Sequence, residues 1–336
     1  MTIERCRISA NVSGSGHLGQ SCAAWCLSCF EHRIQPILRD EGRELLCKVR
    51  SSVWLTTCEP GNVAAVRRRL FPGSLLILWA EALGGPQASV GIEPVAAALE
   101  CLHNASLVHD DILDNHQERR RQPTLFSSLG RPFALLGGDG LMAAAFSLLG
   151  RIDDPRLAGC LARLGRATES MIAGQWLDEP ATWAKIAEEG REAHWLQVCK
   201  GKLALGNVWG SLGAFWTGHE ELEADVTGLL ERFSVVSQII NDFGDTFGWT
   251  GYRELVPDSR PYQHEAHQKP TLPAIWSAAR DGTRPELLLA PARAEIARRS
   301  AEAVDTLSRF DLEPSRRQLM LDFFTAPQLP EHWESI

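Results

Sequence analysis

Three aspartates end a long apolar helical pattern between residues 92 and 114, and no other feature constrains the fold as strongly. Apolar residues recur about every 3.6 positions along this stretch, which predicts one helix ending at Asp110, Asp111 and Asp114. Residues four apart share a helix face, so Asp110 and Asp114 would project together, with Asp111 beside them. Carboxylates crowded in this way repel one another unless a cation lies between them. Mg²⁺ suits such a position because it prefers oxygen ligands and is often shared between carboxylates and a substrate phosphate.

A second acidic cluster lies far downstream, in the segment QIINDFGD at residues 238–245. Asp242 and Asp245 fall within one helical turn and follow an apolar run. Two helices that face each other with such clusters would hold a metal-bound diphosphate between them.

The rest of the chain also predicts helices. Pro72 suits the first turn of an apolar helix that Gly84 and Gly85 end. Further helical patterns cover residues 135–149, 154–175, 188–212, 220–247, 272–279 and 285–307. We find no useful alternating strand pattern and no G-x-G-x-x-G after a strand. We therefore expect an all-α bundle around a central cavity, with a loosely ordered N-terminal arm at 1–35 and one helical domain at 36–336.

Composition excludes several partners. The net charge is −8, with 42 acidic and 34 basic residues and no extended basic stripe, which argues against nucleic acid. No run of about eighteen apolar residues occurs, so we expect no membrane span. The N-terminus lacks the pattern of a secretory signal. Nine scattered cysteines include one CxxC, at Cys26 and Cys29, and indicate reduced structural thiols in a cytoplasmic protein.

Six segments, in order, resemble motifs of the all-trans isoprenyl diphosphate synthase family, also called polyprenyl synthetases. HNASLVHDDILD is similar to the first aspartate-rich motif, DDxxD, and ERRRQPT to the basic loop after it. GGDGLMAAAF, AGQWLD, QIINDFGD and QKPTLP are similar to the GDxLLaxAF segment, the GQxxD motif, the second aspartate-rich motif and the K-x-TLP segment. The resemblance covers roughly residues 60 to 326 and implies the isoprenoid-synthase (class I terpenoid synthase) bundle.

The resemblance also implies roles for individual residues. The metal ligands, for roughly three Mg²⁺ ions per site, would be Asp110, Asp111, Asp114, Asn241, Asp242 and Asp245. The allylic diphosphate would be bound by Arg119, Gln175, Lys269 and one of Lys200 or Lys202, and the homoallylic diphosphate by Arg68, His103 and Arg120. The family resemblance further implies a homodimer.

The chemistry of such an enzyme needs this set of side chains. Pyrophosphate gains negative charge as the allylic C–O bond breaks, and metal ions with Lys and Arg stabilise that charge best in a water-poor cavity. The carbon fragment becomes an allylic cation, which a dry apolar pocket protects until an alkene attacks it.

The chain departs from the family pattern at both diphosphate sites. Where the family usually reads GGKRLRP, this chain reads VRRRLFP, so Arg68 replaces a lysine and Phe71 replaces an arginine that grips the homoallylic diphosphate. The loss of that contact would cost about 1.5–3 kcal/mol. Arg121 also replaces the glycine usual in RRGxP.

The second acidic cluster is intermediate between two classes of enzyme. Asn241 stands where most elongating members have aspartate, which keeps an oxygen ligand but removes a charge. Terpene cyclases commonly begin this motif with Asn-Asp, but they place Ser or Thr and then Glu at the positions that Asp245 and Trp249 occupy here.

Small residues precede the first cluster where bulky aromatic ones close the pocket floor in short-chain members. Ala105 and Ser106 occupy those positions, five and four residues ahead of Asp110. A product of about twenty carbons or more could therefore be accommodated, unless one of the tryptophans forms a floor.

Three functions are compatible with these residues. Trans transfer of an allylic prenyl group to isopentenyl diphosphate is favoured by Arg68, His103 and Arg120. A terpene synthase that cyclises a C15 or C20 diphosphate, or transfers it to another acceptor, is favoured by Phe71 and Asn241. A non-catalytic synthase subunit is the third, and the acidic clusters argue against it because such a subunit has no need for paired metal sites.

Overall fold

The computed structural model describes residues 22–40, 72–119, 122–246, 269–280 and 282–325. The predicted diphosphate contacts Arg68 and Arg120, and the departures at Phe71 and Arg121, lie outside these residues.

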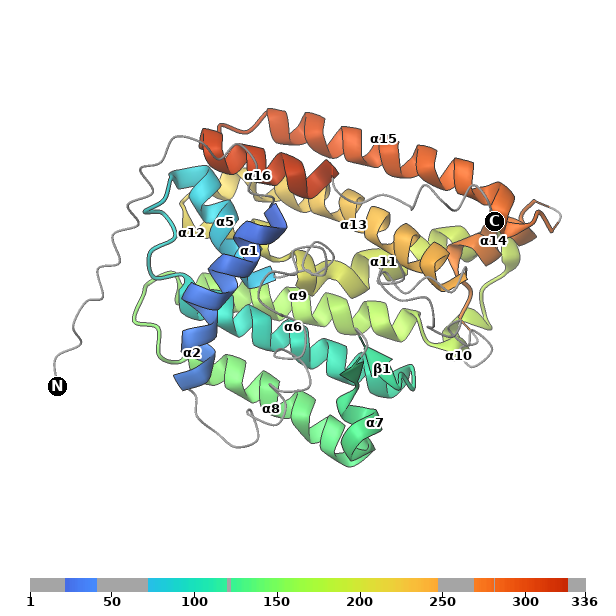
Figure 1. Cartoon of the computed structure of the whole chain (residues 1–336), viewed down its shortest axis with the longest axis horizontal. Coiled ribbons are helices and arrows are strands. Elements are labelled where there is room, and N and C mark those ends of the chain that lie inside the picture. The colour runs from blue at the N-terminus through green and yellow to red at the C-terminus, as the bar shows by residue number, and fades with distance from the viewer. Residues whose placement is uncertain (1–21, 41–71, 120–121, 247–268, 281, 326–336) are drawn as a thin grey trace.

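The described chain is almost entirely helical (Figure 1). Its α-helices are α1 (Cys22–Cys29), α2 (Gln35–Asp40), α5 (Pro72–Gly84), α6 (Glu93–Leu113), α7 (Leu125–Leu129), α8 (Arg131–Leu149), α9 (Leu157–Leu177), α10 (Pro180–Trp183), α11 (Arg191–Asn207), α12 (Trp209–Trp216), α13 (Glu223–Thr246), α14 (Leu272–Ala278), α15 (Leu289–Ser308) and α16 (Pro314–Thr325). Short π or 3₁₀ turns are η1 (Phe30–Ile34), η3 (Glu188–Gly190), η4 (Glu220–Leu222) and η7 (Pro285–Leu288). One antiparallel hairpin pairs β1 (Glu118–Arg119) with β2 (Gln122–Pro123). The all-α prediction is confirmed.

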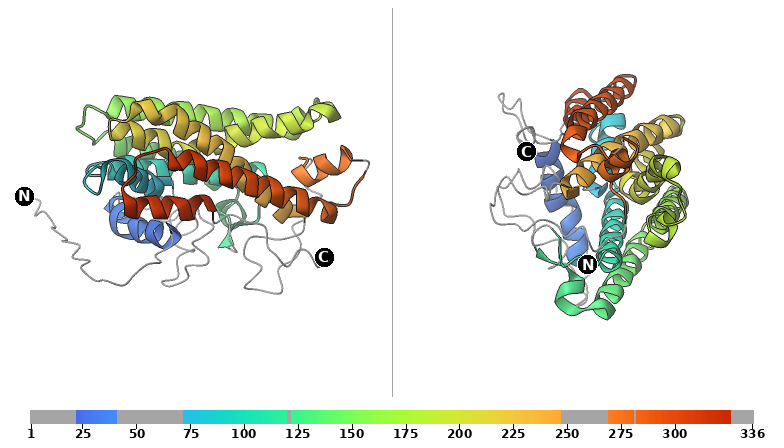
Figure 2. Two further views of the ribbon diagram at one scale, coloured as in Figure 1. Left: turned by 90° about the horizontal axis from the view of Figure 1, so that it is seen from above. Right: turned by 90° about the vertical axis from the view of Figure 1, so that its right-hand side faces the viewer.

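Helix α6 is the central element of the bundle. Its first half is rich in alanine, and the side chains from Val95 to Leu99 are fully buried. Small side chains allow close neighbours, and α6 packs against α8 along one side and α5 along another. Beyond it α9 pairs with α11, while α13 contacts α11, α12 and α15 (Figure 2). The helix carrying the first acidic cluster is therefore surrounded by other helices.

Helices α9 and α11 touch backbone to backbone at two glycines. A Cβ at Gly174 would lie 2.3 Å from the backbone nitrogen of Lys202, and one at Gly201 would lie 2.5 Å from the Cα of Gly174. Only glycine fits at both positions, and the contact sets where Lys202 stands relative to α9.

Residues 22–35 differ from the expected loosely ordered arm. They form α1 and η1, with Phe30 and Ile34 buried in the core. A buried carboxylate, Glu81 of α5, accepts hydrogen bonds from Arg33 at 2.6 Å and from Arg316 of α16 at 2.9 Å. Apolar side chains at helical spacing and this ion pair hold the first described helices against the last one.

The six cysteines in the described ranges are all free and buried. Burial raises the pKa of the Cys29 thiol to about 12, and burial likewise raises the pKa of Cys199. These six agree with the prediction of structural thiols.

Helix α8 is the only helix in the described part of the chain that has the length and apolar composition of a membrane span. About 44% of its apolar window is buried, because one side of α8 packs along α6.

Candidate active site

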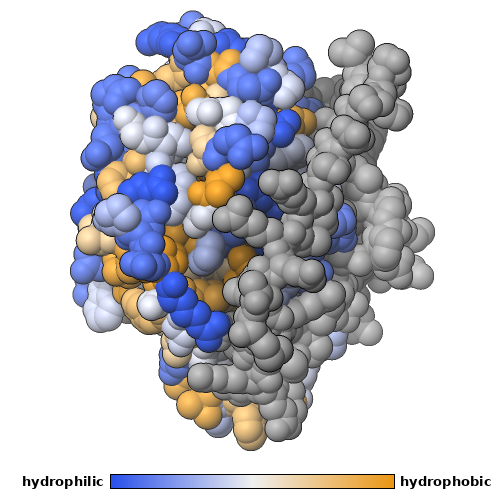
Figure 3. Space-filling view, turned by 90° about the vertical axis from the view of Figure 1, so that its left-hand side faces the viewer, coloured by the Kyte–Doolittle hydropathy of each residue, from blue (hydrophilic) through white to orange (hydrophobic). Residues whose placement is uncertain are grey.

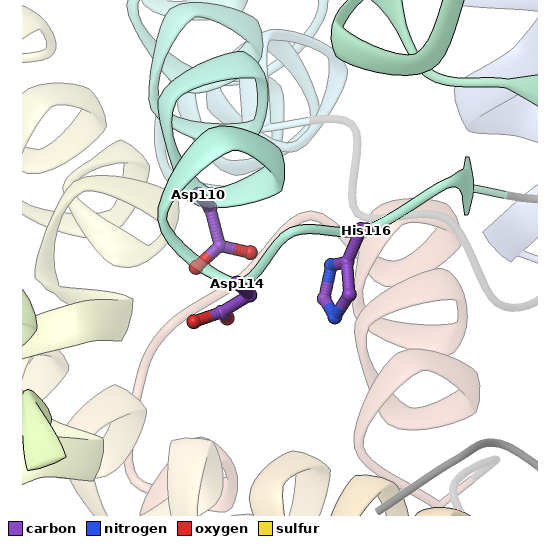
Figure 4. A group of neighbouring side chains, drawn as sticks. All are labelled: Asp110, Asp114 and His116. Atoms are coloured by element: carbon purple, nitrogen blue, oxygen red, sulfur yellow. The ribbon is translucent and has the colours of Figure 1, made fainter. Parts of the chain in front are cut away.

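The first acidic cluster lies at the C-terminal end of α6. Asp110 and Asp111 belong to its last turn, and Asp114 is the residue that ends the helix. Figure 4 shows Asp110, Asp114 and His116 around a common space beside this helix end. A helix C-terminus carries partial negative charge, so three acids there need cations nearby.

Arg119 supplies one such cation. The β1–β2 hairpin turns the chain back toward α6, and the Arg119 guanidinium donates to Asp110 Oδ2 and to Asp111 Oδ1, each at 2.8 Å. His116 Nδ1 lies 3.4 Å from Asp111 Oδ1. Arg119, the arginine of the predicted basic loop that the structure describes, therefore contacts two of the acids directly.

Two lysines approach the same acids from other elements and share a fourth carboxylate, Asp178, which follows α9. Lys202 Nζ of α11 lies 2.7 Å from Asp178 Oδ2 and 3.6 Å from Asp110 Oδ1. Lys269 Nζ lies 2.5 Å from Asp114 Oδ1 and 3.6 Å from Asp178 Oδ2. Of the two lysines left open by the sequence, Lys202 joins the cluster, whereas Lys200 is exposed and pairs with Glu231 at 3.0 Å.

Asp178 is a member of the cluster that sequence reasoning did not select as a site residue. Its signal was present, because it is the final residue of the GQxxD-like segment AGQWLD. Its second oxygen accepts a hydrogen bond from the indole of Trp183 at 3.1 Å, which fixes its orientation between the two lysines.

The charges in this cluster shift one another's pKa values. Burial alone would raise the pKa of Asp110, but Lys202 and Arg119 outweigh it and lower that pKa to about 2. Burial would lower the pKa of Lys202, but Asp110 and Asp178 raise it above its usual range. The carboxylate and the ammonium are therefore both charged at neutral pH.

The second acidic cluster lies on α13, and its Asp242 side chain is less exposed than the Asp110 side chain of the first cluster. Asp242 is buried and accepts hydrogen bonds from Gln238 Nε2 at 2.6 Å, from the Trp195 indole at 2.8 Å and from the Leu272 backbone at 2.7 Å. Burial raises the pKa of Asp242 to about 6, although these hydrogen bonds oppose the shift. Asn241 is exposed.

The remaining predicted residues have varied surroundings. Gln175 lies about one helical turn before Asp178. It is half-buried, and its amide donates a hydrogen bond to the Glu179 carboxylate at 3.2 Å. His103 is half-buried on α6, about two turns before Asp110. Ala105 is buried, and half-buried Ser106 donates to the carbonyl of His103 at 2.7 Å. The side chain of Asp245 lies outside what the structure describes.

The cluster on α6 suits a hard divalent cation. Asp110 and Asp114 each offer a carboxylate oxygen, the ligand such a cation prefers, and these atoms lie within 4.8 Å of each other and of a ring nitrogen of His116. Asp110 Oδ1 is buried and has no hydrogen-bond partner among the described residues, because Lys202 is 3.6 Å away. A buried, anionic oxygen without a donor is a fitting ligand for Mg²⁺.

The chain has the all-α fold of class I terpenoid synthases, with an acidic helix end opposed by arginine and lysine. The sequence profile described as "Polyprenyl synthetase" matches residues 68–255, and the chain belongs to that family.

Curated relatives include (2E,6E)-farnesyl diphosphate synthase of Mycobacterium tuberculosis, 29% identical over 62% of this chain and 56% of the relative. Farnesyl diphosphate synthase of Geobacillus stearothermophilus is 42% identical over 35% of this chain and 41% of the relative. These matches thus span about half, or less, of the relatives' lengths.

Solved structures agree on the fold. The polyprenyl synthetase of Streptomyces coelicolor superposes with a TM-score of 0.69 at 21% identity, covering 90% of this chain and 99% of that one. A decaprenyl diphosphate synthase of Rhodobacter capsulatus superposes with a TM-score of 0.68 at 20% identity, covering 90% of this chain and 97% of that one.

Proposed function

We propose that this chain ionises an allylic prenyl diphosphate with the help of Mg²⁺ and transfers the prenyl group, in trans geometry, to isopentenyl diphosphate. The products would be pyrophosphate and a prenyl diphosphate of about C20 or longer. The observation that carries this proposal is the cluster in which carboxylates of α6 and Asp178 meet Arg119, Lys202 and Lys269.

Carboxylates at the end of α6 would hold the metal, with Asn241 and Asp245 contributing from α13. Asp110 has a free buried oxygen for this purpose, and Asp114 lies one turn away on the same face. When bound, Mg²⁺ supplies positive charge that stabilises the departing pyrophosphate.

Arg119, Lys202 and Lys269 would bind the allylic diphosphate. Each now pairs with a carboxylate, so each must exchange that partner for a phosphate oxygen. The exchange keeps every buried cation paired, which avoids the cost of a lone buried charge. Gln175 would lie nearby, and Arg68, His103 and Arg120 would bind the second diphosphate.

A terpene synthase of the same descent is the second candidate, and Asn241 is the observation that favours it. Asn241 is exposed, and it offers metal one neutral oxygen in place of a carboxylate. Such an enzyme would cyclise a C15 or C20 diphosphate, or transfer it to another acceptor, without isopentenyl diphosphate.

One incubation series separates these functions. The full-length protein is mixed with Mg²⁺ and C10, C15 or C20 allylic diphosphates, with and without isopentenyl diphosphate, and the products are analysed by mass spectrometry. Longer diphosphates that form only with isopentenyl diphosphate are the expected result. Hydrocarbons or alcohols formed without it would favour the second candidate, and no metal-dependent pyrophosphate release from folded protein would contradict both.

The pocket-floor residues support a long product. Ala105 and Ser106 have small side chains on the turn of α6 before the acids, so neither blocks a growing chain. Ser106→Phe would put a ring there and is expected to shorten the product. An unchanged chain length would mean that the floor lies elsewhere.

We also propose that the protein is a cytoplasmic homodimer. The buried free thiols fit a reducing compartment. The dimer is supported by α8, on which Phe133, Leu136 and Phe146 are 60%, 58% and 60% exposed. In Figure 3, hydrophobic side chains reach the surface toward the lower end of the view, the end that holds α7 and α8 in Figure 1. An apolar surface of this kind usually contacts another protein.

Light scattering after size-exclusion chromatography tests the dimer. Phe146→Glu should give a monomer, because burial of a carboxylate in an apolar interface is costly. Leu287→Glu is the matched control, since Leu287 is 61% exposed but belongs to η7, and this variant should stay dimeric. A monomeric wild-type protein would contradict the proposal.

A further inference from the structure

The hydrogen-bond partners of Asp242 differ in kind from those of the acids of α6: they are uncharged donors rather than arginine and lysine. Its donors come from three elements: Gln238 of α13 contacts Oδ1, while the Trp195 indole of α11 and the Leu272 amide of α14 share Oδ2. Both oxygens are thus occupied inside the bundle, and the residue is 5% exposed. By contrast, Asp110 retains a buried oxygen with no hydrogen bond.

Asn241, the residue before Asp242 on α13, is exposed to solvent, whereas Asp242 is buried. Successive helix residues differ by about 100° in direction, so Asn241 and Asp242 cannot both face the same side. Asn241 is exposed, whereas Asp242 faces the packed side. The side chain of Asp242 is therefore directed into the packing of the bundle, where protein donors hold it.

The amide that Asp242 binds is the first of α14. Thr271 precedes that helix and makes no capping hydrogen bond with its side chain, and Pro273 has no N–H. Asp242 thus provides the acceptor that the helix start lacks. Thr246, one turn later on α13, adds a second contact, because its hydroxyl lies 3.4 Å from that of Thr271.

Lys269 stands three residues before this anchor, so its backbone lies at most about 11 Å along the chain from Leu272. Pro270 lies between them and restricts the chain further. At the other end, Lys269 Nζ reaches Asp114 at 2.5 Å and Asp178 at 3.6 Å. The position of the ammonium group thus depends on where α13 holds the start of α14.

We propose that Asp242 is a positioning residue rather than a metal ligand: through the Leu272 amide it fixes the start of α14 and thereby holds Lys269 against Asp114 and Asp178. Its part in catalysis rests on the proposed function, but its hold on α14 does not. This replaces the metal-binding role that the family resemblance implied for Asp242.

Hydrogen exchange in the metal-free protein, followed by mass spectrometry, tests the anchor without any substrate. Asp242→Asn should speed exchange across Leu272–Ala278 by roughly ten-fold or more, because a charge-assisted hydrogen bond to the helix start is weakened. Asp110→Asn is the matched control; it removes an equal charge without touching α14. Unchanged exchange in α14 for Asp242→Asn would overturn the proposal.

Trp195→Phe serves if Asp242→Asn does not fold. It removes one donor but leaves the carboxylate in place, so α14 should exchange faster than in the wild type, by a smaller factor. Exchange at the wild-type rate in this variant would count against the anchor as well.

A double-mutant cycle with Lys269→Met tests the link to the reaction. If Asp242 acts through Lys269, Asp242→Asn should raise the KM for the allylic diphosphate when Lys269 is present. The same substitution should have little further effect on that KM in the Lys269→Met background. Equal effects in both backgrounds, together with an equal rise in the Mg²⁺ requirement, would instead identify Asp242 as a ligand. A wild-type protein with no activity would defeat the proposed function while the exchange result still stood.

Discussion

The contact between Gly174 and Gly201 offers a test of how the site is built. Gly174→Ala would place a methyl group 2.3 Å from the backbone nitrogen of Lys202, where ordinary contacts begin at 3.4 Å. Both atoms sit on helix backbones, so no side chain can turn away, and α9 and α11 must separate by about 1 Å.

The separation has two measurable costs. Overpacking of this size destabilises a protein by about 1–3 kcal/mol. Lys202 follows Gly201 on α11, and under the proposed function it contacts the diphosphate. A displacement of about 1 Å in such a group can lower a rate by roughly a hundred-fold. The variant should thus lose stability in urea denaturation and lose Mg²⁺-dependent pyrophosphate release at saturating substrate.

Gly165→Ala is the matched control on the same helix. Gly165 is exposed, and a methyl group there would meet nothing within 4 Å. Alanine is the better helix former, so this variant should gain about 0.5–1 kcal/mol and keep its activity. If Gly174→Ala were as stable and as active as Gly165→Ala, the helix contact would not set the position of Lys202.

Three further predictions concern charge and thiols. Asp110→Asn should lower metal-dependent pyrophosphate release by at least about a hundred-fold while the far-ultraviolet circular dichroism stays unchanged; full activity would remove Asp110 from the metal site. Arg156, chiefly through its side-chain hydrogen bond, lowers the pKa of Asp154 from 3.8 to about 2, so the pair stabilises the fold above pH 4 and loses that effect as the pH falls toward 2. Asp154→Asn should therefore be less stable than the wild type in urea at pH 7, with a gap that shrinks below pH 4; a constant gap would contradict this pairing. With an aromatic disulfide reagent at pH 8, at most three of the nine thiols should react in the native protein and all nine after unfolding, because the other six are buried; a fourth fast thiol would contradict that burial.

Helices with a strong apolar period were predictable, but several of their ends were not. The pattern at 92–114 matches α6, and the pattern at 220–247 matches α13 within three residues. The pattern at 188–212, by contrast, covers α11 and the first half of α12, which are divided at Val208. The same apolar spacing continues across that break, so hydrophobicity alone could not reveal it.

Among the elements that were missed, α16 and the β1–β2 hairpin were missed for different physical reasons. The charged first half of α16 hides the apolar residues that pack its second half, namely Leu319, Met320 and Phe324. The β1–β2 hairpin is two residues long on each side, too short for any alternating pattern.

Sequence reasoning selected most of the charged residues that the structure brings together at the end of α6, but not the pairs that they form. Spacing alone brought Asp110 and Asp114 together, but the pairing of Asp178 with Lys202 and Lys269 joins segments far apart in the chain. The burial of Asp242 was also beyond reach, because motif position does not reveal which side of α13 is packed.

Under the proposed function, the pairing of cations with acids at the end of α6 would make the binding of metal and the binding of diphosphate thermodynamically dependent on each other. A metal ion arriving alone must compete with Arg119 and Lys269 for carboxylates, and a diphosphate arriving alone must take those cations from their acids. When both arrive, each releases the partner that the other needs, and the net charge of the cluster changes little. Linkage then requires that each ligand tighten the binding of the other by the same factor. Productive binding would then need metal and diphosphate together, a coincidence requirement set by the ion pairs at the end of α6.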